Sequence, residues 1–146
     1  MKKAITIALT VTALAVPSVN AWASATTQKT IPKKKIVVAT KSFTGTPGSA
    51  GQWGDVQVTI VVKKTTTTVI KTKKKTVARR ITSVTVPVYP DHTDRSIFIN
   101  QQALPYLIQE TLQAQSTGIN MISGATYTSQ GFGQSLQSAI LAARAW

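Results

Sequence analysis

The sequence predicts an α+β fold, in which a small antiparallel sheet carries two C-terminal amphipathic helices packed on it. Apolar and polar residues alternate along residues 55–63 and again along 80–88, which is the period of a half-buried strand. Beyond residue 100 the apolar residues recur every three or four positions, which is the period of a helix. Strands that precede helices in the chain favour a sheet with its helices on one face.

The first strong strand signal covers residues 55–63. Its alternating apolar residues, which predict one buried face, are Val56, Val58, Ile60 and Val62. Residues 65–70 are all β-branched, as strands favour, and we expect them to pair with this strand as a hairpin that turns at Lys63-Lys64.

Shorter signals complete the sheet. Residues 36–39 form a β-branched run, and residues 80–88 repeat the alternation up to Pro87. Because proline lacks a ladder donor, this strand is expected to end there or to lie on an edge. Residues 44–51, rich in glycine and proline, and residues 89–92 are predicted as turns.

Two helices follow. The stripe of the first consists of Leu104, Leu107, Ile108, Thr111 and Leu112. Asn100 is the predicted N-cap, Pro105 is expected to kink the helix or delay its start, and Gly118 is expected to end it. The stripe of the second consists of Phe132, Leu136, Ala139, Ile140 and Ala143. Thr128 or Ser129 is the predicted cap of this second helix.

The N-terminus has the three parts of a secretory signal peptide. Lys2-Lys3 is a basic start, residues 4–16 are mostly apolar, and Ala21-Trp22-Ala23 is a small-x-small cleavage site. The apolar run is too short for a mature transmembrane helix, which needs about 20 residues. Cleavage after about Ala23 leaves 146 − 23 = 123 residues, enough for one domain. The alternative is an uncleaved N-terminal anchor.

The predicted organisation therefore has three parts, which are a signal peptide (1–23), a basic and largely flexible leader (24–42) and one folded domain (43–146). We expect an exported protein, whether secreted, periplasmic or held at the cell surface. The chain has no cysteine, which excludes disulfides, thiolate metal sites and a lipid-anchored cysteine.

Positive charge is concentrated in the first half of the chain. The sequence has 17 Lys and Arg against four Asp and Glu, and only Arg95 and Arg144 lie beyond residue 80. A basic surface attracts anionic polymers, and for an exported protein these are anionic wall polymers or the membrane surface, with no specific nucleic acid expected. The alternative is that the lysines keep the protein soluble and protect exposed strand edges.

The segment most informative about function is Ser-Gly-Ala-Thr-Tyr-Thr-Ser, residues 123–129, directly before the last helical pattern. Backbone N–H groups at a helix start lack intrahelical partners and favour an anion, phosphate above all. The hydroxyls of Ser123, Thr128 and Ser129 are candidate phosphate ligands. The alternative is an ordinary hydroxyl-rich capping loop.

This run, with Gln115-Ser116 before it and Gly131-Phe132 after it, resembles the FMN-binding domain family. The family includes the flavin-carrying C subunit of the sodium-pumping NADH:quinone reductase and the G subunit of the Rnf complex. The resemblance covers roughly residues 43–145 and is densest over 100–143. It implies a stand-alone secreted form of this domain, with FMN as its cofactor.

The resemblance also implies how the cofactor is held. In the family, a flavin transferase moves FMN from FAD onto the threonine that closes Ser-Gly-Ala-Thr, which is Thr126 here. The cofactor-binding residues implied are Asn120, Ser123, Gly124, Ala125, Thr126, Tyr127, Thr128 and Ser129. The family pattern usually has aspartate six positions before the threonine. Asn120 keeps the size of that side chain but lacks its charge.

An isoalloxazine ring needs an apolar or aromatic slot, for which several residues are candidates. These are Tyr89, Phe98, Met121, Ile122, Tyr127 and Phe132, and Trp53 either lines the slot or covers a sheet edge. No catalytic residue and no metal site is predicted. His92 with Asp91 and Asp94 lacks the spacing of a metal site and is typical of solvated surface.

The resulting hypothesis is an extracytoplasmic electron carrier in a membrane-associated redox chain, rather than an enzyme with its own substrate. The implied partners are a flavin transferase and membrane or extracytoplasmic redox proteins. Two alternatives stay open, namely a domain that holds FMN reversibly and a basic surface protein that binds anionic polymers.

Overall fold

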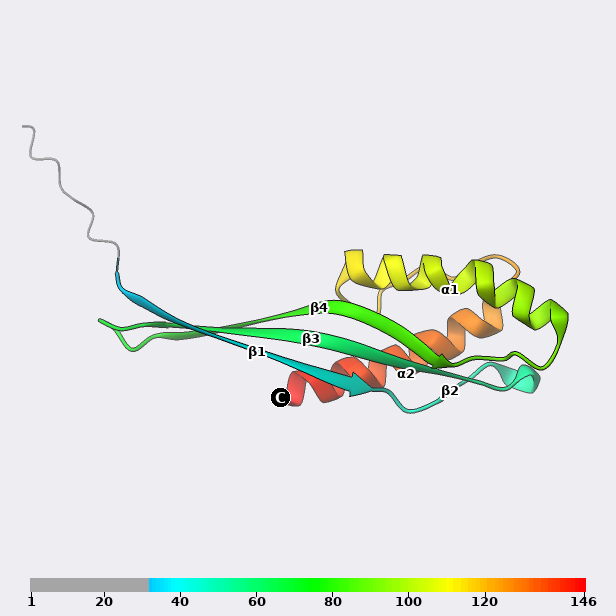
Figure 1. Ribbon diagram of the computed structural model, residues 1–146, viewed down its shortest axis with the longest axis horizontal. Coiled ribbons are helices and arrows are strands. Elements are labelled where there is room, and N and C mark those ends of the chain that lie inside the picture. Colours follow the sequence, from blue (N-terminus) through cyan, green and yellow to red (C-terminus); the bar gives the residue numbers. More distant parts are fainter. Residues whose placement is uncertain (1–31) are drawn as a thin grey trace, which may run out of the picture. The chain divides into compact units, whose positions relative to one another are not determined.

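The sheet is built around one long central strand. In the computed structural model, which describes residues 32–146, β3 (Asp55–Val69) pairs antiparallel with β1 (Lys34–Thr44) along one edge and with β4 (Lys75–Val88) along the other (Figure 1). The short β2 (Gly48–Ser49) pairs with the first two residues of β3. The predicted signal peptide and the first part of the predicted leader lie outside the described residues.

Three helical elements complete the fold of the described residues. The 3-10 helix η1 (Gly51–Trp53) precedes β3, and α1 (Asp94–Ala114) and α2 (Thr126–Ala145) follow β4. Helix α2 packs on β3, and α1 contacts β4 and α2. The prediction of an α+β fold with an antiparallel sheet is therefore confirmed. None of the helices within residues 32–146 combines the length and apolarity needed to cross a membrane.

The core lies where α2 covers β3, as the two apolar periods predict. The alternating residues of β3, Val56, Val58, Ile60 and Val62, are at most 2% exposed. The five residues of the predicted α2 stripe are all buried against them. In α1, Leu104, Leu107 and Thr111 are buried, and Ile108 and Leu112 are partly buried against the same cluster.

The predicted hairpin at Lys63-Lys64 is wrong. Strand β3 continues through both lysines to Val69, and the chain turns after it, with Lys73 in the left-handed region at φ 54°. Two consecutive lysines form no turn when β-branched residues flank them on both sides, because those residues favour the extended backbone. The partner of residues 65–69 is therefore the start of β4, which begins five residues earlier than predicted.

The other strand boundaries also differ from the sequence prediction. Within the predicted flexible leader, residues 34–42 instead form most of β1. The prediction of an edge position for the strand with Pro87 is confirmed, because β4 pairs with β3 alone among the described strands. The register shifts between the pairs Thr59↔Thr85 and Gln57↔Val88, so β4 has one extra residue where proline lacks a donor.

Helix α1 begins earlier than predicted. Thr93 is its N-cap, with an extended backbone and a side-chain oxygen that accepts the Ser96 N–H, so the prediction of Asn100 as N-cap is wrong. Pro105 lies inside the continuous helix. The helix ends at Ala114, before Gly118, with Gln115 in the left-handed conformation as its C-cap.

Helix α2 replaces strand partners where the edge beside β3 is interrupted. In β3, the Val58 N–H donates to the Ser135 hydroxyl at 2.8 Å. In the connection between β1 and β2, the Thr46 N–H donates to the Ser138 hydroxyl at 2.7 Å. The backbones approach so closely that a Cβ on Gly48 would lie 2.0 Å from the carbonyl oxygen of Gly131. Only glycine at both positions permits this contact.

We predict opposite effects for two Gly→Ala substitutions in α2. Gly131→Ala places a Cβ 2.8 Å from the Gly48 carbonyl oxygen, so it should destabilise the protein by about 1–3 kcal/mol. Gly133→Ala meets no heavy atom within 4 Å and should stabilise the helix by about 0.5–1 kcal/mol. Urea unfolding measures both, and equal stabilisation by the two changes would contradict the close backbone contact.

Candidate functional site

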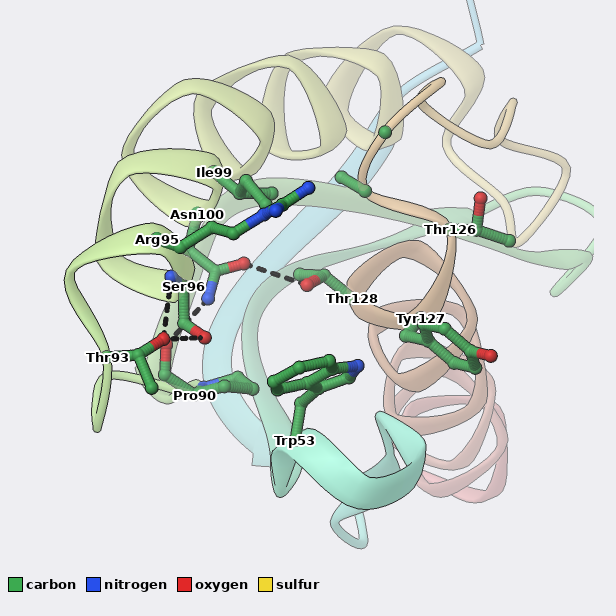
Figure 2. Close-up of a pocket in the computed structure, with 12 residues that line it drawn as sticks. Trp53, Pro90, Thr93, Arg95, Ser96, Ile99, Asn100, Thr126, Tyr127 and Thr128 are labelled. Carbon is green, nitrogen blue, oxygen red and sulfur yellow. Dashed lines mark hydrogen bonds between the residues drawn. The ribbon is translucent and has the colours of Figure 1, made fainter.

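An open cavity lies where η1, the start of α1 and the start of α2 meet (Figure 2). The space within it is about 470 Å³, part of which is open to solvent. The residues that line it are Trp53, Pro90, Thr93, Arg95, Ser96, Ile99, Asn100, Gly124, Ala125, Thr126, Tyr127 and Thr128. Five of the eight sequence-predicted cofactor residues are among them.

The start of α2 presents unpaired backbone donors to this cavity. Gly124 has φ +82°, and the helix begins two residues later with Ala125 as N-cap. An alanine side chain cannot accept a hydrogen bond, so the N–H groups of Thr126, Tyr127 and Thr128 have neither a capping side chain nor an intrahelical acceptor. The prediction that Thr128 or Ser129 caps the helix is wrong, because both lie within its first turn.

Asn100 joins three segments beneath the cavity. Its side chain, 1% exposed, donates to the Pro90 carbonyl oxygen at 2.7 Å and accepts the Thr128 hydroxyl at 2.8 Å (Figure 2). One amide therefore links the loop before α1, α1 itself and the first turn of α2. This arrangement fixes the distance between the two helix starts, which form opposite walls of the cavity.

The hydroxyls of the motif have different environments. Those of Thr128 and Ser129 are buried and bonded to protein groups, since Ser129 donates to the Ala125 carbonyl oxygen and accepts the Ile122 N–H. Thr126 is exposed at the first position of α2, and its hydroxyl bonds to no other group within the described residues 32–146. Ser123 is exposed and lines a neighbouring hollow.

Asn120 lies outside both hollows. Its side-chain amide donates to the Glu110 carboxylate on α1. A carboxylate is therefore present beside position 120, although it belongs to another residue. Because this pair is exposed, the direct contribution of its hydrogen bond to stability is small.

The candidates for a ring slot are distributed over three places. Trp53 and Tyr127 line the cavity, where the Tyr127 ring packs over Gly51. Phe98 and Ile122 line the neighbouring hollow, which shares Ile99, Gly124 and Ala125 with the cavity. The other three candidates do not line either hollow: Phe132 and Tyr89 belong to the core, and Met121 is exposed.

Arg95 and the loop residues around it line the cavity but were not predicted as site residues from the sequence. Among residues 32–146, Arg95 is the only charged residue that lines the cavity, and it lies in the first turn of α1. A signal for this turn was present in Thr93-Asp94-Arg95-Ser96, because threonine is a good N-cap and aspartate is favoured in a first turn. Across residues 32–146, no group of three or more His, Asp and Glu side chains is placed to hold a metal.

This geometry defines a class of protein, namely an α+β domain that offers unpaired helix-start donors, one arginine and two aromatic side chains to an anionic ligand that carries a ring. The model of the FMN-binding domain family matches residues 51–141, more than half of the chain. The chain therefore belongs to the FMN-binding domain family, as its motif predicts, and FMN is its cofactor. None of the curated proteins compared with the chain matches it.

We predict that Asn100→Ala weakens the fold and the cavity together. The change leaves the Pro90 carbonyl and the Thr128 hydroxyl without their buried partner, which costs about 1–3 kcal/mol for each group left unpaired. Gln102→Ala removes an exposed amide from the same helix and is the matched control, expected within about 0.5 kcal/mol of the parent. Thermal unfolding of the three proteins provides the comparison, and similar melting temperatures would contradict the linking role of Asn100.

Proposed function

We propose that this protein is an exported electron carrier in which FMN is attached through its phosphate to the hydroxyl of Thr126. The observation that carries the proposal is the position of Thr126. Its hydroxyl is exposed at the first residue of α2, at the edge of the cavity and beside the unpaired N–H groups. No other serine or threonine hydroxyl of the 123–129 motif is both exposed and part of the cavity lining.

The residues present fit such a group. A phosphate ester at Thr126 would meet the backbone N–H groups of the first helical turn, where the helix dipole adds about 0.3–1 kcal/mol. Space is available beside it, because a Cβ built on Gly124 would meet no heavy atom within 4 Å. Arg95 supplies a positive charge across the cavity, and Trp53 and Tyr127 supply aromatic walls for a ring.

Attachment requires a partner enzyme, for which we propose a flavin transferase that uses FAD. The Thr126 oxygen forms a bond to the phosphorus of the FMN half, and the pyrophosphate P–O bond of FAD breaks, so that AMP leaves. The hydroxyl proton passes to a base of the transferase or to solvent, and nothing is oxidised or reduced. The exposure of Thr126 allows a second protein to reach it.

The bound cofactor supplies the redox chemistry, and the protein supplies attachment and orientation. A tether replaces dissociation by a high effective concentration at the site, which suits a protein outside the cytoplasm where little free flavin is present. We propose membrane-bound or extracytoplasmic redox proteins as the electron donors and acceptors, and residues 1–23 as the signal for export.

The second candidate function is a domain that holds FMN reversibly. Asn120 favours it, because the family pattern usually has a charged aspartate at this position. In that case the same donors and walls would bind the cofactor without a bond to Thr126, and denaturation would release it.

We predict that covalent flavin depends on the hydroxyl at position 126. After co-expression with a flavin transferase, the parent protein should keep its flavin through denaturation, Thr126→Ser should keep part of it, and Thr126→Val should lose it. In-gel fluorescence and intact mass measure the outcome. Flavin that copurifies with the native protein and is released by denaturation would support the reversible candidate instead.

We also predict that a carboxylate beside position 120 assists attachment, since Glu110 lies bonded to Asn120. Glu110→Gln removes the negative charge beside Asn120 and should lower the covalent flavin yield several-fold at a fixed reaction time. The double variant Asn120→Asp/Glu110→Gln restores one charge at the position of the family pattern and should recover the yield. Equal yields in all three proteins would mean that the transferase needs no carboxylate there.

A further inference from the structure

The sheet extends well beyond the helices that cover its core (Figure 1). We define the arm as residues 33–41, which are Lys33 and most of β1, together with residues 63–80, which comprise the second half of β3, the turn and the start of β4. Apolar side chains that would be buried in a core are open to solvent here, with Ile36 61%, Ile70 58% and Val37 51% exposed. The end of α2 reaches only the base of the arm, beside Arg79 and Arg80, and the rest of the arm extends beyond both helices.

The arm is strongly and uniformly basic. It contains 12 of the 17 Lys and Arg residues of the chain and no Asp or Glu. These residues are Lys33, Lys34, Lys35, Lys41, Lys63, Lys64, Lys71, Lys73, Lys74, Lys75, Arg79 and Arg80. Positive charges at this density repel one another and attract anions.

The charges lie on both faces of the arm and at its tip. Lys63 is directly opposite Arg80 and Lys64 is directly opposite Arg79 in the β3–β4 register. Successive residues of a strand point to opposite faces, so each face carries one of these pairs. The tip adds four lysines in and after the turn, at positions 71 and 73–75. Like charges directly opposite each other destabilise a sheet, so the isolated arm has an unfavourable arrangement that a bound anion would relieve.

One of these pairs already binds an oxygen acceptor. Lys64 and Arg79 both donate to the backbone oxygen of Trp146, and the Lys64 ammonium lies 4.7 Å from the centre of the Trp146 ring. The spacing of two cations across the β3–β4 ladder therefore suits an oxygen ligand shared between them. Nearer the tip the β3 residues that face β4 are threonines 65–68, so the remaining cations of the arm lie singly rather than in such pairs.

Protection of strand edges explains only part of the pattern. Lysines that discourage edge-to-edge pairing need to lie on edge strands. Lys63 and Lys64 lie on the central strand, which is paired on both sides, and the lysines at 71, 73 and 74 lie in the turn. These five charges protect no edge.

The chemistry of the arm distinguishes between classes of polyanion. It has no Phe, Tyr or Trp between residues 33 and 41 or between 63 and 80, so it offers no platform for stacking nucleic-acid bases and no aromatic anchor for a membrane interface. Its exposed apolar residues occur on both faces, whereas a helix or sheet that lies on a bilayer separates them to one. Threonines 65–68, between the cationic ends, add hydroxyl donors for phosphate oxygens.

We propose that the arm binds a flexible, linear polymer of phosphate diesters that lacks bases, and that the polymer wraps both faces of the arm. A wrapped polymer neutralises the positive charges of the arm on both faces and at the tip. A planar anionic surface could contact only one face at a time. Binding releases counterions from the polymer, so the affinity falls as salt rises.

The test uses the full folded chain with the change Thr126→Val, so that its result does not depend on flavin attachment. The probe is poly(glycerol phosphate), and its binding is measured between 50 and 300 mM salt by titration calorimetry. Each phosphate contact contributes about 0.7 to the slope of log K against log salt for a flexible strand. Changing the four tip lysines, Lys71, Lys73, Lys74 and Lys75, to glutamine should therefore lower the slope by about 3 and weaken binding by on the order of tenfold or more.

Two controls test whether the effect comes from the charge of the tip lysines, rather than from a change of fold, and whether it is specific to the arm. Arginine at the same four positions keeps the charge and should keep the slope. Arg144→Gln removes an exposed cation of α2, outside the arm and outside the cavity, and should lower the slope by no more than about 0.7. Four outcomes would overturn the proposal: no binding of the polymer, equal binding of free glycerol phosphate, tighter binding to phosphatidylglycerol vesicles, and tighter binding to single-stranded DNA.

Discussion

The contact between α2 and the interrupted edge beside β3 determines where the functional end of the molecule lies. At Gly48 and Gly131 two backbones approach at a distance that excludes any side chain, and Ser135 supplies the hydrogen bond that a continuous strand would have made to Val58. The helix can therefore neither slide nor rotate without leaving buried groups unpaired. Thr126, five residues before Gly131 on a rigid helix, takes its position from this contact.

Through its hydrogen bonds, Asn100 holds the opposite wall of the cavity in a fixed position relative to α2. The packing of α2 fixes Thr128, Thr128 fixes the amide of Asn100, and Asn100 fixes the Pro90 loop from which α1 begins. The walls of the cavity come from segments that are distant in sequence. Because these hydrogen bonds link the segments to one another, the walls cannot move independently. Preformed donors of this kind need little rearrangement when an anion arrives.

Much of the buried structure could be predicted from the sequence, because it depends on local periods. The face of β3 and the stripe of α2 follow from alternation and helical spacing alone. The turns and caps could not be predicted in the same way. Thr93 and Asn100 are both good caps by residue type, and only tertiary contacts, with Pro90 and Thr128, make Asn100 a buried link. For the site, the motif at 123–129 was visible in the sequence, whereas Arg95 required the fold.

The length of β3 also determines the distance between the cavity and the tip of the arm. Its first residue, Asp55, follows the η1 segment that borders the cavity, and its last residues lie in the arm. Fifteen extended residues span about 50 Å, so the cavity and the tip of the arm lie at opposite ends of one rigid strand. A molecule immobilised by its tip would present its redox centre to the surrounding fluid, where freely diffusing partners could collide with it from many directions.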